Sequence, residues 1–287
     1  MSRRLALYAQ GGKIKQPLYT GTYTVTTIGA YVYMYLLTSG TLTIQSKGAY
    51  DFFAVGGGAS GGAAGNDSYS APGGGGGGGS GYTKTWKDLA LSAGAVGAVT
   101  IGAGGIGQKG TWNGSTTGGH LTGGASALVI GSTTYSAAGG KALASVYRHD
   151  GTDGGTGGST AYKDGVSDGA NGVAYSYTSF TAGKGQLTNT RAFGESTNTL
   201  YGGGGAGCPP QSAIRNGQIS YSTGGAGGGG RGVGTAYNNT DPVAESGTAN
   251  TGGGGGGAYH HSDTDWGGWS IAGSGGSGLI IVRWPIA

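Results

Sequence analysis

The 287-residue chain has one cysteine, Cys208, six prolines, and charged residues at only 10% of its positions. A single cysteine cannot form an intrachain disulfide, which excludes a disulfide framework. Six prolines without a repeating Gly-x-y register exclude a collagen triple helix. No segment approaches the roughly 20 consecutive apolar residues of a membrane-spanning helix, so we expect no insertion into a membrane.

The sequence also lacks an extended helical period of apolar residues, so we expect no long helix. Its first residues, Met-Ser-Arg-Arg-Leu-Ala-Leu, carry two positive charges but no apolar stretch of signal-peptide length. We therefore expect a product of the cytoplasm that reaches the outside by cell lysis. The net charge is +4, and the sixteen Lys and Arg residues are scattered rather than clustered. This distribution does not predict a nucleic-acid partner.

Glycine dominates what is present, with 73 residues. The glycine-rich blocks cover residues 56–81, 102–124, 151–172, 202–234 and 252–278. A disordered chain of this kind usually carries high charge and few aromatic residues, whereas this one has low charge, 18 Tyr and 5 Trp. The glycine-rich part is therefore expected to be folded.

Short segments rich in β-branched and aromatic residues surround and interrupt the glycine blocks, and they predict strands. The predicted strands are 18–27, 31–38, 40–45, 51–55, 89–101, 127–135 and 278–285. Because strands stand at both ends of the glycine-rich part, the chain is expected to return to where it began, as a folded domain does.

Glycine runs can fold in the polyproline-II conformation, which has three residues per turn and a rise of about 3.1 Å per residue. Such chains have no internal hydrogen bonds, so their backbone groups must be satisfied by neighbouring chains. We therefore expect the runs 73–79 and 252–257 to be extended and packed against chains of the same kind. The predicted fold class is all-β and irregular, with short β-strands at both ends framing a packed polyglycine-II helix sandwich.

Two enzyme motifs occur but lack the structural context they require. Residues 102–107 match Gly-x-Gly-x-x-Gly, yet the following residues cannot open a helix and no acidic ribose ligand follows at the expected distance. Ser60 and Ser167 each lie in a Gly-x-Ser-x-Gly pattern, which also requires a strand, a turn and a helix. We therefore predict no catalytic residue, no cofactor and no enzymatic activity.

The densest group of functional side chains is Tyr259, His260, His261, Trp266 and Trp269. The adjacent histidines lack zinc-like spacing, and the nearby Asp-x-Asp has no later glutamate to complete a calcium loop, so no metal site is predicted. Aromatic and histidine side chains are typical of binding surfaces. Two interpretations stay open: an exposed recognition loop, or aromatic side chains packed against the flank of the glycine chains.

Tyr147, Arg148 and His149 form a second polar-aromatic cluster, and the same two interpretations apply to it. Tyrosine among small polar residues provides rigid contact area at little entropic cost, as in antibody paratopes. We predict that these three residues join the 259–269 cluster on one receptor-binding surface.

Three motifs carry a resemblance to a known family: Ser-Gly-Thr-Leu-Thr-Ile (39–44), Tyr-Asp-Phe-Phe-Ala-Val-Gly-Gly-Gly (50–58) and Gly-Leu-Ile-Ile-Val-Arg-Trp (278–284). Together they resemble the glycine-rich domain of phage and prophage tail proteins, and the chain is similar to polyglycine-II tail-fibre-tip adhesins. The resemblance covers residues 31–287. It implies a sandwich of polyglycine-II helices whose loops are exposed at one end and, in the adhesins, contact the host receptor.

On this resemblance we expect a non-enzymatic bacteriophage virion protein of the tail fibre or baseplate. Residues 1–30 would dock to other virion proteins, and residues 31–287 would form the glycine-rich domain. The aromatic loops would bind a protein or glycan of the bacterial surface. The alternative is a purely structural virion decoration or stiffening protein with no receptor role.

Overall fold

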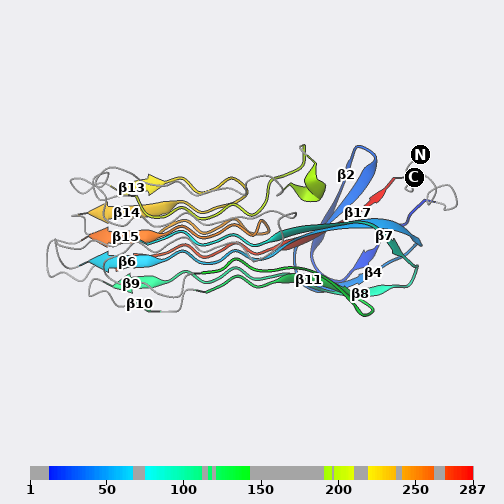
Figure 1. Ribbon diagram of the computed structural model, residues 1–287, viewed down its shortest axis with the longest axis horizontal. Coiled ribbons are helices and arrows are strands. Elements are labelled where there is room, and N and C mark those ends of the chain that lie inside the picture. Colours follow the sequence, from blue (N-terminus) through cyan, green and yellow to red (C-terminus); the bar gives the residue numbers. More distant parts are fainter. Residues whose placement is uncertain are drawn as a thin grey trace.

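The protein is described by a computed structural model covering residues 13–66, 75–111, 116–117, 121–142, 191–195, 197–209, 219–236, 241–261 and 269–286. Throughout these residues the fold is all-β, without an α-helix, and its sheets are open. The molecule is elongated: a pair of large sheets lies at one end, smaller sheets lie at the other, and extended segments run between them (Figure 1).

Two antiparallel five-stranded sheets form the first end, here called the proximal sandwich. The first sheet has the order β1 (Leu18–Tyr19), β4 (Gly40–Thr43), β8 (Val96–Thr100), β11 (Ser126–Ile130) and β12 (Thr133–Ala137). The second has the order β2 (Tyr23–Ile28), β3 (Tyr31–Leu36), β17 (Leu279–Pro285), β5 (Gly48–Val55) and β7 (Thr83–Leu91). Strands from the two ends of the chain thus meet, because β17 inserts between β3 and β5.

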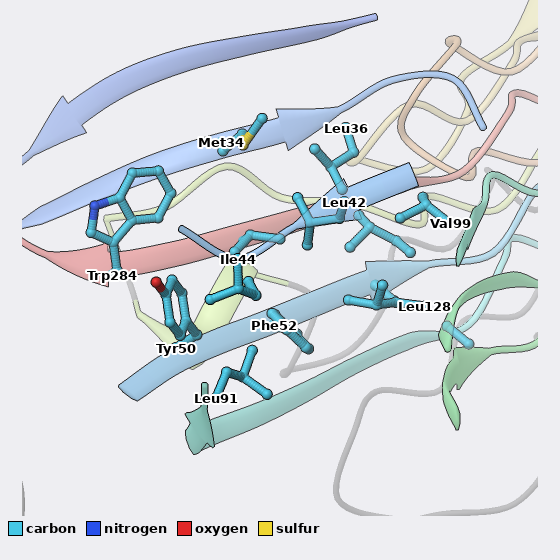
Figure 2. Packing of buried hydrophobic residues seen from close by; sticks show 14 of the residues in the cluster. Met34, Leu36, Leu42, Ile44, Tyr50, Phe52, Leu91, Val99, Leu128 and Trp284 are labelled. Carbon is cyan, nitrogen blue, oxygen red and sulfur yellow. The ribbon is translucent and has the colours of Figure 1, made fainter. Parts of the chain in front are cut away.

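The main hydrophobic core lies between these two sheets (Figure 2). Alternate residues of a strand point to one face, so Phe52 of β5 and Val282 of β17 face this core while Phe53 and Ile281 face the opposite side. Leu42 of β4 and Leu128 of β11 enter the core from the first sheet. Each buried side chain of this size contributes about 1.5–3 kcal/mol, so the core anchors the proximal sandwich.

The outer face of the second sheet is covered by residues near a short 3-10 turn, η1 (Ala192–Gly194). Arg283 of β17 is 1% exposed; its Nε donates to Asp51 Oδ2 at 2.9 Å and its NH1 donates to Glu195 Oε1 at 2.6 Å. The guanidinium also lies 3.9 Å from the centre of the Phe193 ring. Burial alone would lower the pKa of Arg283, but hydrogen bonds to Glu195, Tyr33 and Asp51 outweigh it and raise that pKa.

Extended glycine-rich segments leave the proximal sandwich side by side, and we call them the glycine bundle (Figure 1). Each N–H from Gly57 to Gly62 donates to a carbonyl of another segment, at 2.8–3.1 Å. The acceptors repeat every third residue: positions 57 and 60 bond to 121–124, positions 58 and 61 to 273–276, and positions 59 and 62 to 76–79. A β-strand repeats every second residue, so this pattern is not that of a β-sheet.

The carbonyl groups of the same segment accept from three further segments. The donors are Gly140 to Gly57, Gly105 to Gly58, and Gly255 and Ala258 to Ala59 and Gly62. Residues 56–62 are therefore surrounded by neighbours on all sides and are buried. Their backbone groups are satisfied by segments far away in the sequence.

Smaller sheets, here called the distal sheets, close the other end of the molecule. One has the order β13 (Ile219–Ser222), β14 (Gly232–Ala236), β15 (Ala258–His261) and β6 (Ala63–Asn66); β14, β15 and β6 are parallel. The other has the order β10 (Thr116–Thr117), β9 (Lys109–Thr111) and β16 (Trp269–Ile271).

The predicted strands 31–38, 40–45, 51–55 and 278–285 are confirmed by β3, β4, β5 and β17. Three predicted strands are wrong in extent: 18–27 is divided into β1 and β2, which belong to different sheets, and 89–101 and 127–135 are each broken by a turn. Gly94 has φ 81° and Gly131 has φ 59°, which reverse the chain between β7 and β8 and between β11 and β12. The extended part of the run 252–257 begins at Gly253, one residue later than predicted, because Gly252 has φ 68° and belongs to a turn.

Candidate functional site

The distal end of the molecule is the candidate binding surface. Strands β6, β14, β15 and β9 end there, while β13, β10 and β16 begin there (Figure 1). The parallel arrangement of β14, β15 and β6 brings the ends of three strands to one edge. Chain segments far apart in the sequence therefore meet at this end.

Tyr259 and His260 do not lie in an exposed loop, and that part of the prediction is wrong. They belong to β15, an inner strand of the four-stranded sheet, and are 2% and 3% exposed. The parallel neighbours β14 and β6 pair with both edges of β15, so its backbone lies inside the sheet, and both side chains are buried. Their burial favours the packed interpretation over the exposed loop for these two residues.

Trp269 is half-buried at the start of β16. Its backbone N–H donates to Asp241 Oδ1 at 2.8 Å, and Lys109 Nζ of the neighbouring β9 lies 4.0 Å from its ring centre. A cation over an indole face is attracted by the ring's negative π surface. The side chain is thus held in place by two adjacent strands and keeps part of its surface accessible.

The remaining predicted receptor-binding residues are not all placed. Tyr147, Arg148, His149 and Trp266 lie outside the described residues, and His261 is described only through its backbone in β15. The described residues that flank 143–190 lie toward the proximal sandwich, since Gly140 bonds to Gly57 just after β5, and Phe193 packs on Phe53.

An exposed aromatic and charged group near β13 was not among the residues predicted from the sequence. Tyr221 of β13 is 55% exposed, and the guanidinium of Arg231 lies 5.1 Å from its ring centre. Arg231 Nε also donates to Glu245 Oε2 at 2.9 Å, and both side chains are more than half exposed. The alternation Ile-Ser-Tyr-Ser was the available signal, because it places Ile219 and Tyr221 on the same exposed face of an edge strand.

The chemistry of this surface is that of recognition. An aromatic ring, a guanidinium and a carboxylate offer stacking, hydrogen-bond donors and hydrogen-bond acceptors at one place. Among the described residues, no group of three or more His, Cys, Asp or Glu side chains is placed to hold a metal ion. Nor does any helix within the described ranges have the length and apolar character needed to cross a membrane.

The two enzyme motifs are part of the scaffold where they are described. Ser60 is 2% exposed inside the glycine bundle, and its hydroxyl accepts a hydrogen bond from the N–H of Leu121 at 3.2 Å. The 102–107 motif continues from β8 as an extended segment and leads into β9, where a dinucleotide site would need a helix. Ser167 lies outside the described residues.

The fold and this surface define a class: an all-β protein whose centre consists of hydrogen-bonded glycine segments. A family model described as a glycine-rich domain matches residues 37–285, and the chain belongs to that family. Comparison with curated proteins finds no match.

Proposed function

We propose that this protein is a non-enzymatic component of a bacteriophage virion, located at the tail fibre or baseplate, that attaches to a bacterial surface. The distal end would bind a surface protein or glycan of the host. The N-terminal segment, residues 1–30, would dock to other virion proteins, and the protein would be made in the host cytoplasm and released by lysis. The resemblance to glycine-rich phage tail proteins supports this choice among the glycine-rich domains.

The glycine bundle acts in this proposal as a stiff spacer of packed polyglycine-II helices. Its support is the three-residue repeat of hydrogen-bond acceptors, which matches the three residues per turn of that conformation. The run 254–258 follows the same repeat: Gly254 and Gly257 donate to the segment 203–206, and Gly255 and Ala258 to 59–62. Because each segment is hydrogen-bonded to neighbours on several sides, the bundle resists bending in each of those directions.

The observation that carries the proposal is the separation of the two ends. The proximal sandwich contains the main hydrophobic core and both described chain ends, whereas strand ends meet at the distal sheets (Figure 1). The distal sheets carry Trp269 at the start of β16 and Tyr221 on β13, with Arg231 just before β14. A spacer that holds aromatic and charged side chains away from its attachment point is suited to contact another surface.

Competition for adsorption tests the proposal. The purified full-length protein should bind cells of a susceptible bacterial strain and reduce adsorption of the phage that encodes it. A panel of strains that differ in surface protein and glycan would then identify the receptor class. If the protein is present in virions but binds no strain that the phage infects, the structural alternative replaces this proposal.

Trp269, together with Trp266 three residues before it in the sequence, provides the matching test by mutation. Anchor residues of this kind lose about 2 kcal/mol or more of binding when truncated to alanine. We expect Trp266→Ala with Trp269→Ala to weaken adsorption at least about tenfold, while the melting temperature stays nearly unchanged.

Thr133→Ala is the control, because Thr133 is exposed on the proximal sandwich and should leave adsorption unaltered. A folded double variant with normal adsorption would remove these tryptophans from the receptor site. Tyr221→Ala would then show whether the surface around Arg231 binds instead.

A further inference from the structure

Strand β2 is an exposed edge of the proximal sandwich. It stands at the end of the second sheet, and β3 is its strand partner within the described part of the chain. All six of its residues, Tyr-Thr-Val-Thr-Thr-Ile, are exposed, with Tyr23 at 38%, Val25 at 39% and Ile28 at 45%. Figure 1 shows β2 projecting from the proximal end, away from the distal sheets.

The register of β2 with β3 shows which backbone groups point outward. Leu37 N donates to Thr22 O, and Thr22 is followed by the pairs Tyr23 with Leu36 and Thr24 with Tyr35. In an antiparallel pair, alternate residues bond to the partner strand. The N–H and C=O groups of Tyr23, Val25 and Thr27 therefore point away from β3, toward the open side of the sheet.

The other edge strand of this sheet, β7, is protected against edge-to-edge association, unlike β2. Strand β7 carries Lys84, Lys87 and Asp88, and its pairing with β5 shifts register between Tyr50 and Phe52. Charges and register irregularities are the usual means of preventing edge-to-edge association. Strand β2 has neither charge nor proline nor a register shift.

The charge pattern favours a second copy of the chain as the occupant. Residues 16–46 contain no charged side chain, although charged residues make up 10% of the whole sequence. In a two-fold symmetric pair the same surface meets itself, so any charge at its centre would face an identical charge. Strand β2 avoids this repulsion and offers β-branched and aromatic side chains for cross-strand contacts.

We propose that two copies of this protein associate by antiparallel pairing of β2 with β2, so that the second sheet continues from one copy into the other. The inference goes beyond the proposed function, because it concerns association of the protein with itself. Pairing at β2 uses residues 23–28 of the segment proposed for docking, so docking to other virion proteins would use the rest of residues 1–30. The distal sheets of both copies stay uncovered. The dimer would present two binding ends, and two linked ends bind a surface more tightly than one.

Sedimentation analysis of the full-length protein over a wide concentration range tests the proposal. The unaltered chain should sediment as a dimer, and Val25→Pro as a monomer, because proline removes an outward N–H while an edge strand tolerates it. Circular dichroism and the melting temperature establish that Val25→Pro is folded. A monomeric unaltered chain would overturn the proposal and would leave another segment or another virion protein as the partner of β2.

Charge exchange provides a second test that does not depend on proline. Val25→Lys and Val25→Glu should each weaken dimerisation about tenfold or more, because like charges then face each other across the pair. Their equimolar mixture should form the mixed dimer. Thr133→Lys is the matched control, since it adds the same charge to another exposed edge strand, β12, and should stay dimeric. A dimer that survives both charge variants unchanged would show that β2 is not the interface.

Discussion

At the scale of single residues, the glycines of the bundle are required by the close approach of neighbouring backbones. A Cβ built on Gly254 would lie 1.9 Å from the carbonyl oxygen of Gly78, and one on Gly61 would lie 2.1 Å from that of Gly256. Both neighbours are main-chain atoms held by their own hydrogen bonds, so they cannot move aside cheaply. The space that a side chain would need is occupied by a carbonyl oxygen, and that oxygen accepts a hydrogen bond from another segment of the same chain.

Gly254→Ala should therefore destabilise the protein strongly. We expect a loss of about 3 kcal/mol or more in the free energy of unfolding, from steric overlap and broken backbone hydrogen bonds. Chemical denaturation measures it. Gly131→Ala is the control: Gly131 has φ 59° and open space around its Cβ position, so its cost is limited to the conformational strain of about 1–2 kcal/mol. Similar losses in both variants would mean that the bundle accommodates a methyl group at position 254 without steric overlap.

At the scale of elements, one arginine joins the segment around η1 to the second sheet. Arg283 is fixed between Asp51 of β5 and Glu195, which follows η1. Phe193 packs on Phe53 and beneath the same guanidinium, with φ 60°. The ion pairs therefore connect the segment around η1 to the sheet that contains β2 and β17.

Arg283→Met should test this connection. The substitution leaves Asp51 buried at 4% side-chain exposure without its cation, which should cost about 3–5 kcal/mol. Arg231→Met is the matched control, because the Arg231–Glu245 pair is exposed and is worth less than about 1 kcal/mol. Thermal unfolding distinguishes the two. Adding Asp51→Asn to Arg283→Met should restore part of the loss; no recovery would show that packing, and not charge, explains it.

At the scale of the whole molecule, stability comes from two different sources. The proximal sandwich has a conventional apolar core between its sheets, whereas the glycine bundle has no side chains to pack and is held by backbone hydrogen bonds between segments. The core brings the strands next to the bundle together and so offsets the large conformational entropy that glycine loses on folding. Titration of tyrosines in and near the core should therefore affect the entire fold.

Alkaline pH should reveal this dependence. Burial raises the pKa of both Tyr50 and Tyr201 from 10.0 to about 12, whereas the unfolded chain ionises near 10. Between these values the unfolded state has lost protons that the folded state keeps, so stability is intact below pH 10 and falls as pH rises toward about 12. Calorimetry should show this decline, and Tyr50→Phe with Tyr201→Phe should make it shallower. An equal slope in the double variant would assign the decline to other groups.

The sequence by itself determined the local elements and the class of fold. The strands β3, β4, β5 and β17 were predicted from β-branched and aromatic residues, whose side chains fit a pleated, half-buried surface. The single cysteine excluded an intrachain disulfide, and the lack of a Gly-x-y register excluded a collagen triple helix. The expectation that glycine runs pack against one another also came from sequence, because a bare backbone must find its hydrogen bonds outside its own segment.

Only the tertiary structure decided which segments meet and which side chains are buried. Glycine segments have nearly identical sequences, so nothing local determines that Gly58 bonds to Gly276 or that Gly254 bonds to Gly203. The same holds at the distal end: the burial of Tyr259 depends on the neighbouring strands β14 and β6, and the exposure of Tyr221 depends on its place in an edge strand. Burial is a property of neighbours, and here those neighbours come from distant parts of the chain.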